Sequence, residues 1–167
     1  MTGNNKAVQR LIERFTDAPL TTEEYHGACF VTVAKEKARD VLLFLRSDPD
    51  CAFDMLTDQF GVDYAGQKPR FEIVYLLNSL AHKNRLTVKV RLSEGETFPT
   101  VCDIWKSAEW FEREIFDMFG IRFDNHPDLR RILLDDDFQG HPLRKDFPTE
   151  GYGFNQPFVV RLEGEDE

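Results

Sequence analysis

The sequence predicts an α+β fold: a two-layer domain with a mostly antiparallel sheet and packed helices, followed by an extended irregular C-terminal arm. Residues 71–77 are mostly apolar, and residues 86–92 alternate strictly between aliphatic and polar side chains, which is typical of strands. Apolar residues at helical spacing precede these strands, so helices are expected to cover one sheet. We expect the domain to span residues 1–120, and the arm, with an acidic end, to span residues 121–167.

Two amphipathic helices and a strand are expected in the first 50 residues. Apolar positions recur at helical spacing in residues 5–16, a pattern that Pro19 ends, and again in residues 35–46. The expected inner face of the second helix consists of Ala38, Val41, Leu42 and Leu45. Residues 29–33 alternate as a strand, with Cys29 and two valines on one face.

Further strands are expected in the middle of the chain. Residues 52–56 suggest a short strand before an irregular stretch that contains two glycines. The strands over 71–77 and 86–92 are joined by a polar connection in which Asn84 suits a left-handed turn position, so they form a hairpin. Residues 99–104 are one more candidate strand.

A third helix and then the arm complete the predicted fold. Ser107 suits the N-cap of a helix that ends at Gly120, and Glu109 in its first turn is favoured by the helix dipole. The residues beyond lack periodicity but carry five phenylalanines: Phe123, Phe138, Phe147, Phe154 and Phe158. Such a segment cannot build its own core, so we expect it to lie on a partner protein or back across its own domain.

The composition indicates a soluble, cytoplasmic protein. There are 30 acidic residues against 21 Lys and Arg, and the net charge of −9 disfavours binding to nucleic acid. No apolar run approaches the roughly 18–20 residues that span a bilayer, and the first residues lack a signal peptide. The cysteines, Cys29, Cys51 and Cys102, are far apart and form no CxxC pair. They are therefore interpreted as buried apolar side chains in a chain without a metal cofactor.

The third helix is dense in carboxylates, which raises the question of acid–base catalysis. A catalytic carboxylic acid must be desolvated and kept protonated. Arg113 lies four residues from both Glu109 and Asp117, and a guanidinium there would keep these carboxylates ionised. A structural role is therefore preferred over catalysis by Glu112, Glu114 and Asp117.

Two histidines and a basic cluster stand out in the arm. His126 and His141 each precede a proline, and we expect each to bind a carbonyl or carboxylate and so to lock the arm. A metal site is disfavoured because neither segment supplies a pair such as HExxH. The basic residues are Arg130, Arg131, Arg144 and Lys145. A phosphate or lipid headgroup is conceivable, but pairing with Asp135, Asp136, Asp137, Asp146 or a partner's carboxylates is simpler.

The pattern as a whole resembles a known family. The chain carries Glu-Arg-Glu at 112–114, Asp-Met-Phe-Gly at 117–120, His-Pro-Asp-Leu-Arg-Arg-Ile-Leu at 126–133 and Gly-His-Pro-Leu-Arg-Lys-Asp-Phe-Pro at 140–148. This series resembles the signature of the C subunit of the proton-pumping NADH:quinone oxidoreductase, the 30-kDa subunit family of respiratory complex I. The resemblance covers roughly residues 50–150, and the chain departs from it in the residues that follow.

The resemblance implies a non-catalytic subunit in the peripheral arm of the complex, which passes electrons from NADH to quinone and translocates protons. It implies no cofactor in this chain, with FMN and iron–sulfur clusters in partner subunits. The implied partners are the subunit that shapes the quinone cavity and the subunit with the terminal iron–sulfur cluster. Membrane association would come only through the complex, on the cytoplasmic side of the bacterial inner membrane.

The resemblance also assigns eleven residues to arm geometry and partner contact: Glu112, Arg113, Glu114, Asp117, His126, Asp128, Arg130, Arg131, Arg144, Lys145 and Asp146. Two alternatives stay open. The first is the homologous subunit of an energy-converting membrane-bound hydrogenase or of a ferredoxin-dependent NDH-type complex. The second is a free-standing acidic enzyme that uses the carboxylates of the third helix.

Overall fold

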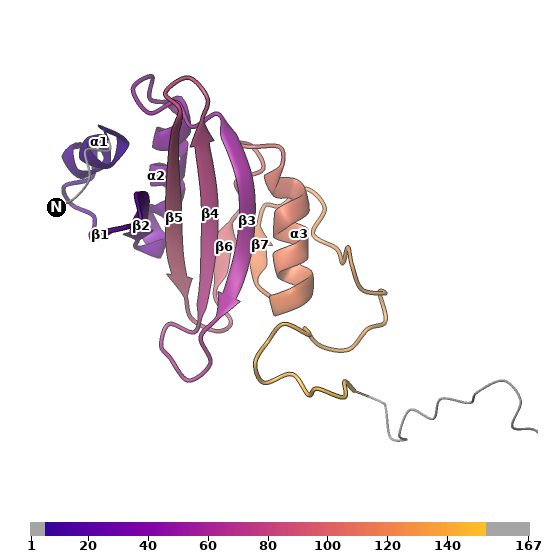
Figure 1. Ribbon diagram of the computed structural model, residues 1–167. Helices are drawn as coiled ribbons and strands as arrows, with labels where there is room; N and C mark the ends of the chain where they lie inside the picture. Colours follow the sequence, from indigo (N-terminus) through magenta and orange to yellow (C-terminus); the bar gives the residue numbers. More distant parts are fainter. Residues whose placement is uncertain (1–5, 153–167) are drawn as a thin grey trace, which may run out of the picture.

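A computed structural model describes residues 6–152 and confirms the two-layer α+β class (Figure 1). In chain order the elements are α1 (Lys6–Arg14), β1 (Leu20–Tyr25), β2 (Ala28–Val33), α2 (Lys35–Ser47), β3 (Met55–Asp63), β4 (Phe71–Ser79), β5 (Asn84–Leu92), β6 (Thr97–Pro99), α3 (Ala108–Phe119) and β7 (Arg122–Asp124). In the view of Figure 1, α2 and the short strands β6 and β7 lie behind the main sheet, and α3 lies beside β3. None of the described helices is long and apolar enough to cross a membrane.

The main sheet has the order β1-β2-β5-β4-β3 and is mostly antiparallel, as expected. Only the pair β2–β5 is parallel, and α2, β3 and β4 form the long connection that a parallel pair requires. On the core face of the two central strands, Tyr75 of β4 lies opposite Val88 of β5, and both are fully buried. The expected hairpin over residues 71–92 is thus confirmed.

In the first half of the chain, the observed elements largely agree with those predicted from the spacing of apolar residues. The helix predicted over 35–46 is α2, and the four residues assigned to its inner face are all fully buried. The strand predicted over 29–33 is β2, in which Val31 and Val33 face the core. The strand β1 was not expected, because its residues are polar and mostly exposed at the edge of the sheet.

Two expectations for the middle of the chain are wrong in detail. The strand expected over 52–56 instead runs from Met55 to Asp63, so Gly61 lies inside a strand. A Cβ at Gly61 would come within 2.8 Å of the Phe119 ring, which explains why glycine stands where α3 packs on β3. In the β4–β5 turn the left-handed residue is Lys83, with a φ of 50°, whereas Asn84 is already the first residue of β5 and pairs with Ser79 of β4.

Residues 99–104 do not form the expected strand. The strand β6 ends at Pro99, and the Val101 N–H donates to the side chain of Glu112 on α3 instead of to a neighbouring strand. Phe98 of β6 lies opposite Phe123 of β7, and both rings are buried. Residues 122–124, just after α3, therefore form a short strand, which was not predicted because their sequence lacks a periodic pattern.

The first residues of the predicted arm form β7, and the described residues that follow, 125–152, contain no helix or strand and run on as an extended trace (Figure 1). Leu129 and Leu134 pack against the core of the domain. Phe147 lies 6.0 Å from Phe138 and 5.2 Å from Tyr152, measured between ring centroids. Of the two placements considered for the arm, this part lies back on its own domain. The acidic end, Phe154 and Phe158 lie outside the described residues.

Candidate functional site: the anchor of the arm on helix α3

Helix α3 carries the first part of the signature, and only its N-terminal end differs from expectation. Gly120 ends the helix in a left-handed conformation with a φ of 75°, as expected of a C-terminal glycine. A Cβ at this position would lie 2.6 Å from the His141 ring, so the same glycine makes room for the arm. At the other end Ser107 makes no capping bond, because its hydroxyl donates to the carbonyl of Leu56 on β3 over 3.2 Å.

The carboxylate of Asp117 is the main attachment point of the arm. The Arg131 guanidinium donates to one of its oxygens over 2.6 Å. Three consecutive backbone N–H groups donate to the other, from Ile132 (3.1 Å), Leu133 (2.9 Å) and Leu134 (3.0 Å). Burial of Asp117 would raise its pKa, but the backbone N–H groups and Arg131 together outweigh this, and the pKa is lowered. Asp117 is thus an ionised, buried anchor.

Two arginines bind backbone carbonyls of the arm. Arg131 also donates to the carbonyls of Phe138 (2.8 Å) and Gly140 (3.1 Å). Arg113 donates to the carbonyls of Arg130 (3.1 Å) and Arg131 (2.8 Å). The expected pairing of Arg113 with the helical carboxylates is therefore wrong, because the arm runs along α3 and offers better-placed acceptors.

Both arm histidines bind backbone atoms, as expected. The Nδ1 atom of His141 lies 2.8 Å from the carbonyl of Asp117. The Nε2 atom of His126 lies 3.2 Å from the carbonyl of Glu109, while its Nδ1 atom accepts the N–H of Asp128 over 3.0 Å. The two rings therefore fasten the arm at both ends of α3.

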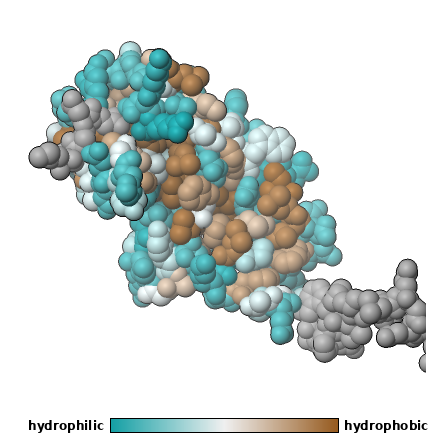
Figure 2. All heavy atoms as spheres, viewed as in Figure 1, coloured by the Kyte–Doolittle hydropathy of each residue, from teal (hydrophilic) through white to brown (hydrophobic). Residues whose placement is uncertain are grey.

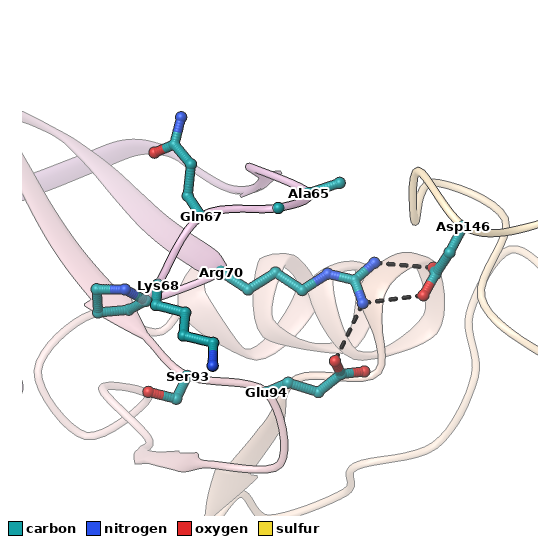
Figure 3. Close-up of a pocket in the computed structure, with 9 residues that line it drawn as sticks. Ala65, Gln67, Lys68, Arg70, Ser93, Glu94 and Asp146 are labelled. Atoms are coloured by element: carbon teal, nitrogen blue, oxygen red, sulfur yellow. Dashed lines mark hydrogen bonds and ion pairs between the residues drawn. The ribbon is translucent and has the colours of Figure 1, made fainter.

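A second anchor holds the far end of the arm to the loop after β3. Arg70 forms paired hydrogen bonds with the carboxylates of Asp63 and Asp146, and it also contacts Glu94. Figure 3 shows its contacts with Asp146 and Glu94. The Lys145 N–H donates to Asp63 over 2.8 Å. The Arg70 hydrogen bonds are the largest cause of the lowered pKa values of Asp63 and Asp146. Arg70, Glu94 and Asp146 also line an open pocket of about 620 Å³.

The four basic residues of the arm do not act as one cluster. Arg131 pairs with Asp117, Arg130 pairs with Asp128 over 2.9 Å, and Arg144 lies 3.2 Å from Glu94. Arg144 also donates to the carbonyl of Phe119 over 2.8 Å. The pairing expected with Asp135, Asp136 and Asp137 is therefore wrong for these arginines, and Asp146 pairs with Arg70.

The side chain of Glu112 is completely buried on the opposite side of α3 from solvent. It accepts hydrogen bonds from the Thr100 hydroxyl (2.5 Å), the Val101 N–H (2.9 Å) and the Cys102 thiol (3.5 Å). Burial raises the pKa of Glu112, and these hydrogen bonds only partly oppose that effect. Nothing in the spacing of residues indicated that this carboxylate, unlike Asp117, would have a raised pKa.

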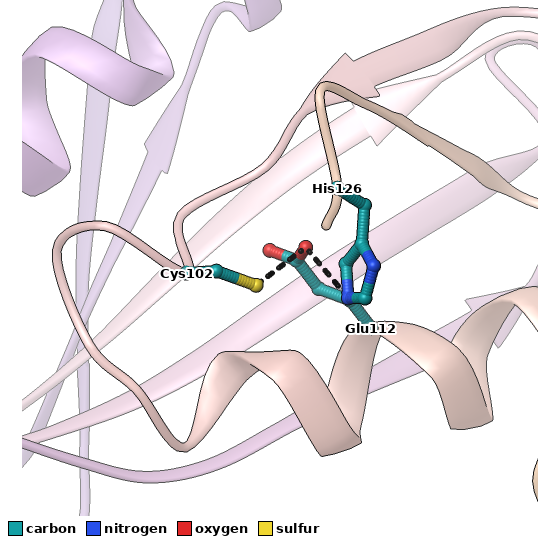
Figure 4. A group of neighbouring side chains, drawn as sticks. All are labelled: Cys102, Glu112 and His126. Carbon is teal, nitrogen blue, oxygen red and sulfur yellow. Dashed lines mark hydrogen bonds and ion pairs between the residues drawn. The ribbon is translucent and has the colours of Figure 1, made fainter. Parts of the chain in front are cut away.

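Cys102, Glu112 and His126 are the described residues that could hold a metal ion, because their ligand atoms lie within 4.8 Å of one another (Figure 4). Two features argue against this. The Nδ1 atom of His126 accepts the Asp128 N–H, so the proton resides on Nε2, the atom that faces Glu112. Burial raises the pKa of the Cys102 thiol to about 12, which disfavours a thiolate ligand. The group fits a hydrogen-bond network better than a metal site.

The structure brings most of the proposed site residues to the interface between α3 and the arm. Lys145 and Asp146 instead lie at the second anchor, and Glu114 is exposed on α3. Sequence reasoning missed Asp63, Arg70 and Thr100, which bind the arm or α3 from distant parts of the chain. No spacing pattern links these residues to their partners, so no signal in the sequence pointed to them.

The sequence is similar to one family of known proteins. Residues 31–153 match the family described as respiratory-chain NADH dehydrogenase, 30 Kd subunit. The C subunit of the NADH-quinone oxidoreductase of Citrifermentans bemidjiense is 50% identical over 163 residues, which are 97% of this chain and 99% of that protein. The corresponding subunit of Geobacter sulfurreducens is 46% identical over 164 residues, again 97% of this chain and 99% of that protein.

One solved structure has a similar fold. It is a chain from the membrane-bound sulfane sulfur reductase, an archaeal respiratory membrane complex, with a TM-score of 0.74. The match covers 96% of this chain and 94% of that chain at 24% sequence identity, so the likeness is one of fold.

Proposed function

The chain belongs to the 30-kDa subunit family of respiratory-chain NADH dehydrogenases, and we propose that it works as the C subunit of an NADH-quinone oxidoreductase. In this role it is a structural subunit without catalytic residues or a redox cofactor. FMN and iron–sulfur clusters in other subunits carry the electrons from NADH to quinone. The chain contributes a folded domain and an arm with a fixed path.

The observation that supports this proposal is the set of hydrogen bonds made by the charged residues and histidines of the signature. Asp117, Arg131 and Arg113 bind arm backbone or one another, and His126 and His141 bind backbone atoms of the helix and the arm. Groups held in this way fix the path of a segment. A catalytic acid or base must instead face a substrate at hydrogen-bond distance.

The surface of the domain supports contact with partner subunits. Figure 2 shows apolar side chains in the middle of the face that presents the sheet, surrounded by hydrophilic ones. Large apolar side chains are also exposed on α3 and the arm, among them Trp110 (58%), Leu133 (64%) and Leu143 (51%). Exposed apolar surface of this kind favours protein interfaces. The proposed partners are the subunit of the quinone cavity and the subunit with the terminal iron–sulfur cluster, on the cytoplasmic side of the membrane.

The proposal is tested by purifying the tagged chain from mild-detergent extracts of membranes of its own host. The fraction is assayed for flavin, iron, nickel and NADH-driven quinone reduction. Flavin and iron together with NADH-driven activity are expected. Nickel without NADH-driven activity would assign the chain to a hydrogenase complex. Recovery of the chain alone from the soluble fraction would contradict a subunit role and would make the α3 carboxylates candidates for catalysis.

A further inference from the structure

The main sheet has two faces, and the described elements cover only one of them. The covered face carries Tyr75 and Val88, and α2, β6 and β7 lie behind it in Figure 1. Side chains alternate along a strand, so Val74 and Leu76 point to the opposite face, which we call the outer face. No described helix lies in front of β3, β4 and β5 in this view.

The outer face carries an apolar patch at its centre. Val74 of β4 lies opposite Phe60 of β3, and Leu76 lies opposite Thr87 of β5, which in turn pairs with Phe30 of β2. Phe60 is 39% exposed. Figure 2 shows apolar side chains in the middle of this face. The outer patch, defined as Phe30, Phe60, Val74 and Leu76, therefore extends over strands β2, β4 and β3.

The sequence of β4 itself indicates that the outer face is covered. A strand with one solvated face alternates between apolar and polar residues, as β5 does. In contrast, β4 is apolar on both faces from Ile73 to Leu77, a pattern that is typical of a strand with protein on both sides. The described domain supplies helices on one side only. The outer patch thus has the composition of a buried surface that lacks its second layer.

Two cations beside this patch lack an acidic partner. Lys89 lies 4.6 Å from the centroid of the Phe30 ring, and Arg85 is exposed on the same face of β5. Neither forms an ion pair with a described carboxylate. The next cation along this face, Arg91, does have such a partner, because it lies 3.6 Å from Glu72. In a chain with a net charge of −9, unneutralised cations at an apolar patch favour an acidic partner.

We propose that the outer patch docks a segment of another subunit, whose apolar side chains cover the patch and whose carboxylates lie over β5, next to Lys89 and Arg85. Asp58 on β3, opposite Leu76, would repel carboxylates on the other side of the patch. The segment is therefore held in one orientation. This inference rests on the proposed subunit role and adds the chemistry of one partner surface to it.

The test uses the complex purified through the tagged chain and a carbodiimide, which joins an amine directly to a carboxylate in contact with it. Mass spectrometry is expected to find Lys89 linked to an aspartate or glutamate of another subunit. Lys89→Arg is the matched control, because it keeps the charge but removes the reactive amine. This variant should assemble normally and lose the crosslink. Lys89→Glu should lower the amount of assembled complex, while thermal unfolding of the purified chain stays like that of the wild type.

Three outcomes would overturn the proposal. One is a crosslink from Lys89 to the acidic residues 163–167 of this chain, which would mean that its own end covers the patch. The others are the absence of any crosslink from Lys89 and normal assembly of Lys89→Glu. Flavin content and NADH-driven quinone reduction of the same preparation test the proposed function separately. A crosslink to a subunit of a hydrogenase complex would contradict that function and leave this inference standing.

Discussion

Asp117 on α3 and Arg131 on the arm lie 2.6 Å apart, 14 residues from each other in the sequence. The same aspartate accepts three consecutive backbone N–H groups of the arm, and the same arginine donates to two arm carbonyls further on. One ion pair therefore organises the backbone from residue 131 to residue 140. This arrangement explains how residues 125–152, which contain no helix or strand, keep one path.

Replacing Asp117 should detach this part of the arm. In Asp117→Asn the charge that pairs with Arg131 is lost, and we expect the free energy of unfolding to fall by about 3 kcal/mol, as for other broken buried pairs. Amide exchange of residues 132–134 should become faster. The control is Glu114→Gln, an exposed change on the same helix, which should stay within about 0.5 kcal/mol of the wild type. Equal stability of the two variants would contradict the anchor role.

Gly120 should tolerate alanine worse than another left-handed glycine. Gly120→Ala adds both the strain of a φ of 75° and a Cβ that lies 2.6 Å from the His141 ring. Gly66→Ala is the matched control, because its φ is 83° but no atom lies within 4 Å of the new Cβ. We expect a difference of about 1–3 kcal/mol between the two variants in thermal or denaturant unfolding. No difference would show that the arm does not need this space.

The three cysteines should differ strongly in reactivity. Burial raises the pKa of Cys51 to about 11 and that of Cys102 to about 12, so neither forms much thiolate at neutral pH. Cys29 is partly exposed near the start of β2. Mass spectrometry after brief treatment with a thiol reagent should find label on Cys29 first. Labelling of Cys102 at the same rate would mean that the Glu112 network opens readily.

The stability of the chain should depend on Glu112 in a defined direction of pH. Because its pKa is raised in the folded state, its protonated form stabilises the fold at low pH, and this contribution is lost as pH rises through the folded pKa. Glu112→Gln removes this titration, so the variant should gain stability relative to the wild type as pH rises. Denaturant unfolding over a pH series measures the difference. A relative loss with rising pH would indicate a lowered pKa instead.

The sequence predicted the elements whose faces are purely apolar. The inner face of α2 and the hairpin of β4 and β5 agree with expectation because burial alone decides them. The strand β3 was mostly missed because its buried positions include the polar residues Gln59 and Asp63, which interrupt the apolar pattern of a strand. The strand β1 was missed because an exposed edge strand needs no apolar pattern.

The candidate site was predicted in its members but not in its contacts. Helical spacing suggested that Arg113 binds carboxylates on its own helix, whereas it binds carbonyls of residues 130 and 131. Neighbours along a helix are visible in the sequence, but the path of an irregular arm is not. For the same reason the partner of Asp146 is Arg70, 76 residues away, which no local pattern indicates.

The central claim, that the α3–arm interface serves assembly and not chemistry, is tested most directly by Arg113→Ala in the host. The variant removes two hydrogen bonds to the arm, and Arg46→Ala, an exposed change on α2, is the matched control. The amount of assembled complex per membrane protein and the NADH:quinone turnover per bound flavin are measured. The account predicts less assembled complex in Arg113→Ala with unchanged turnover per flavin. Normal assembly with reduced turnover per flavin would contradict it and would place Arg113 in the quinone chemistry.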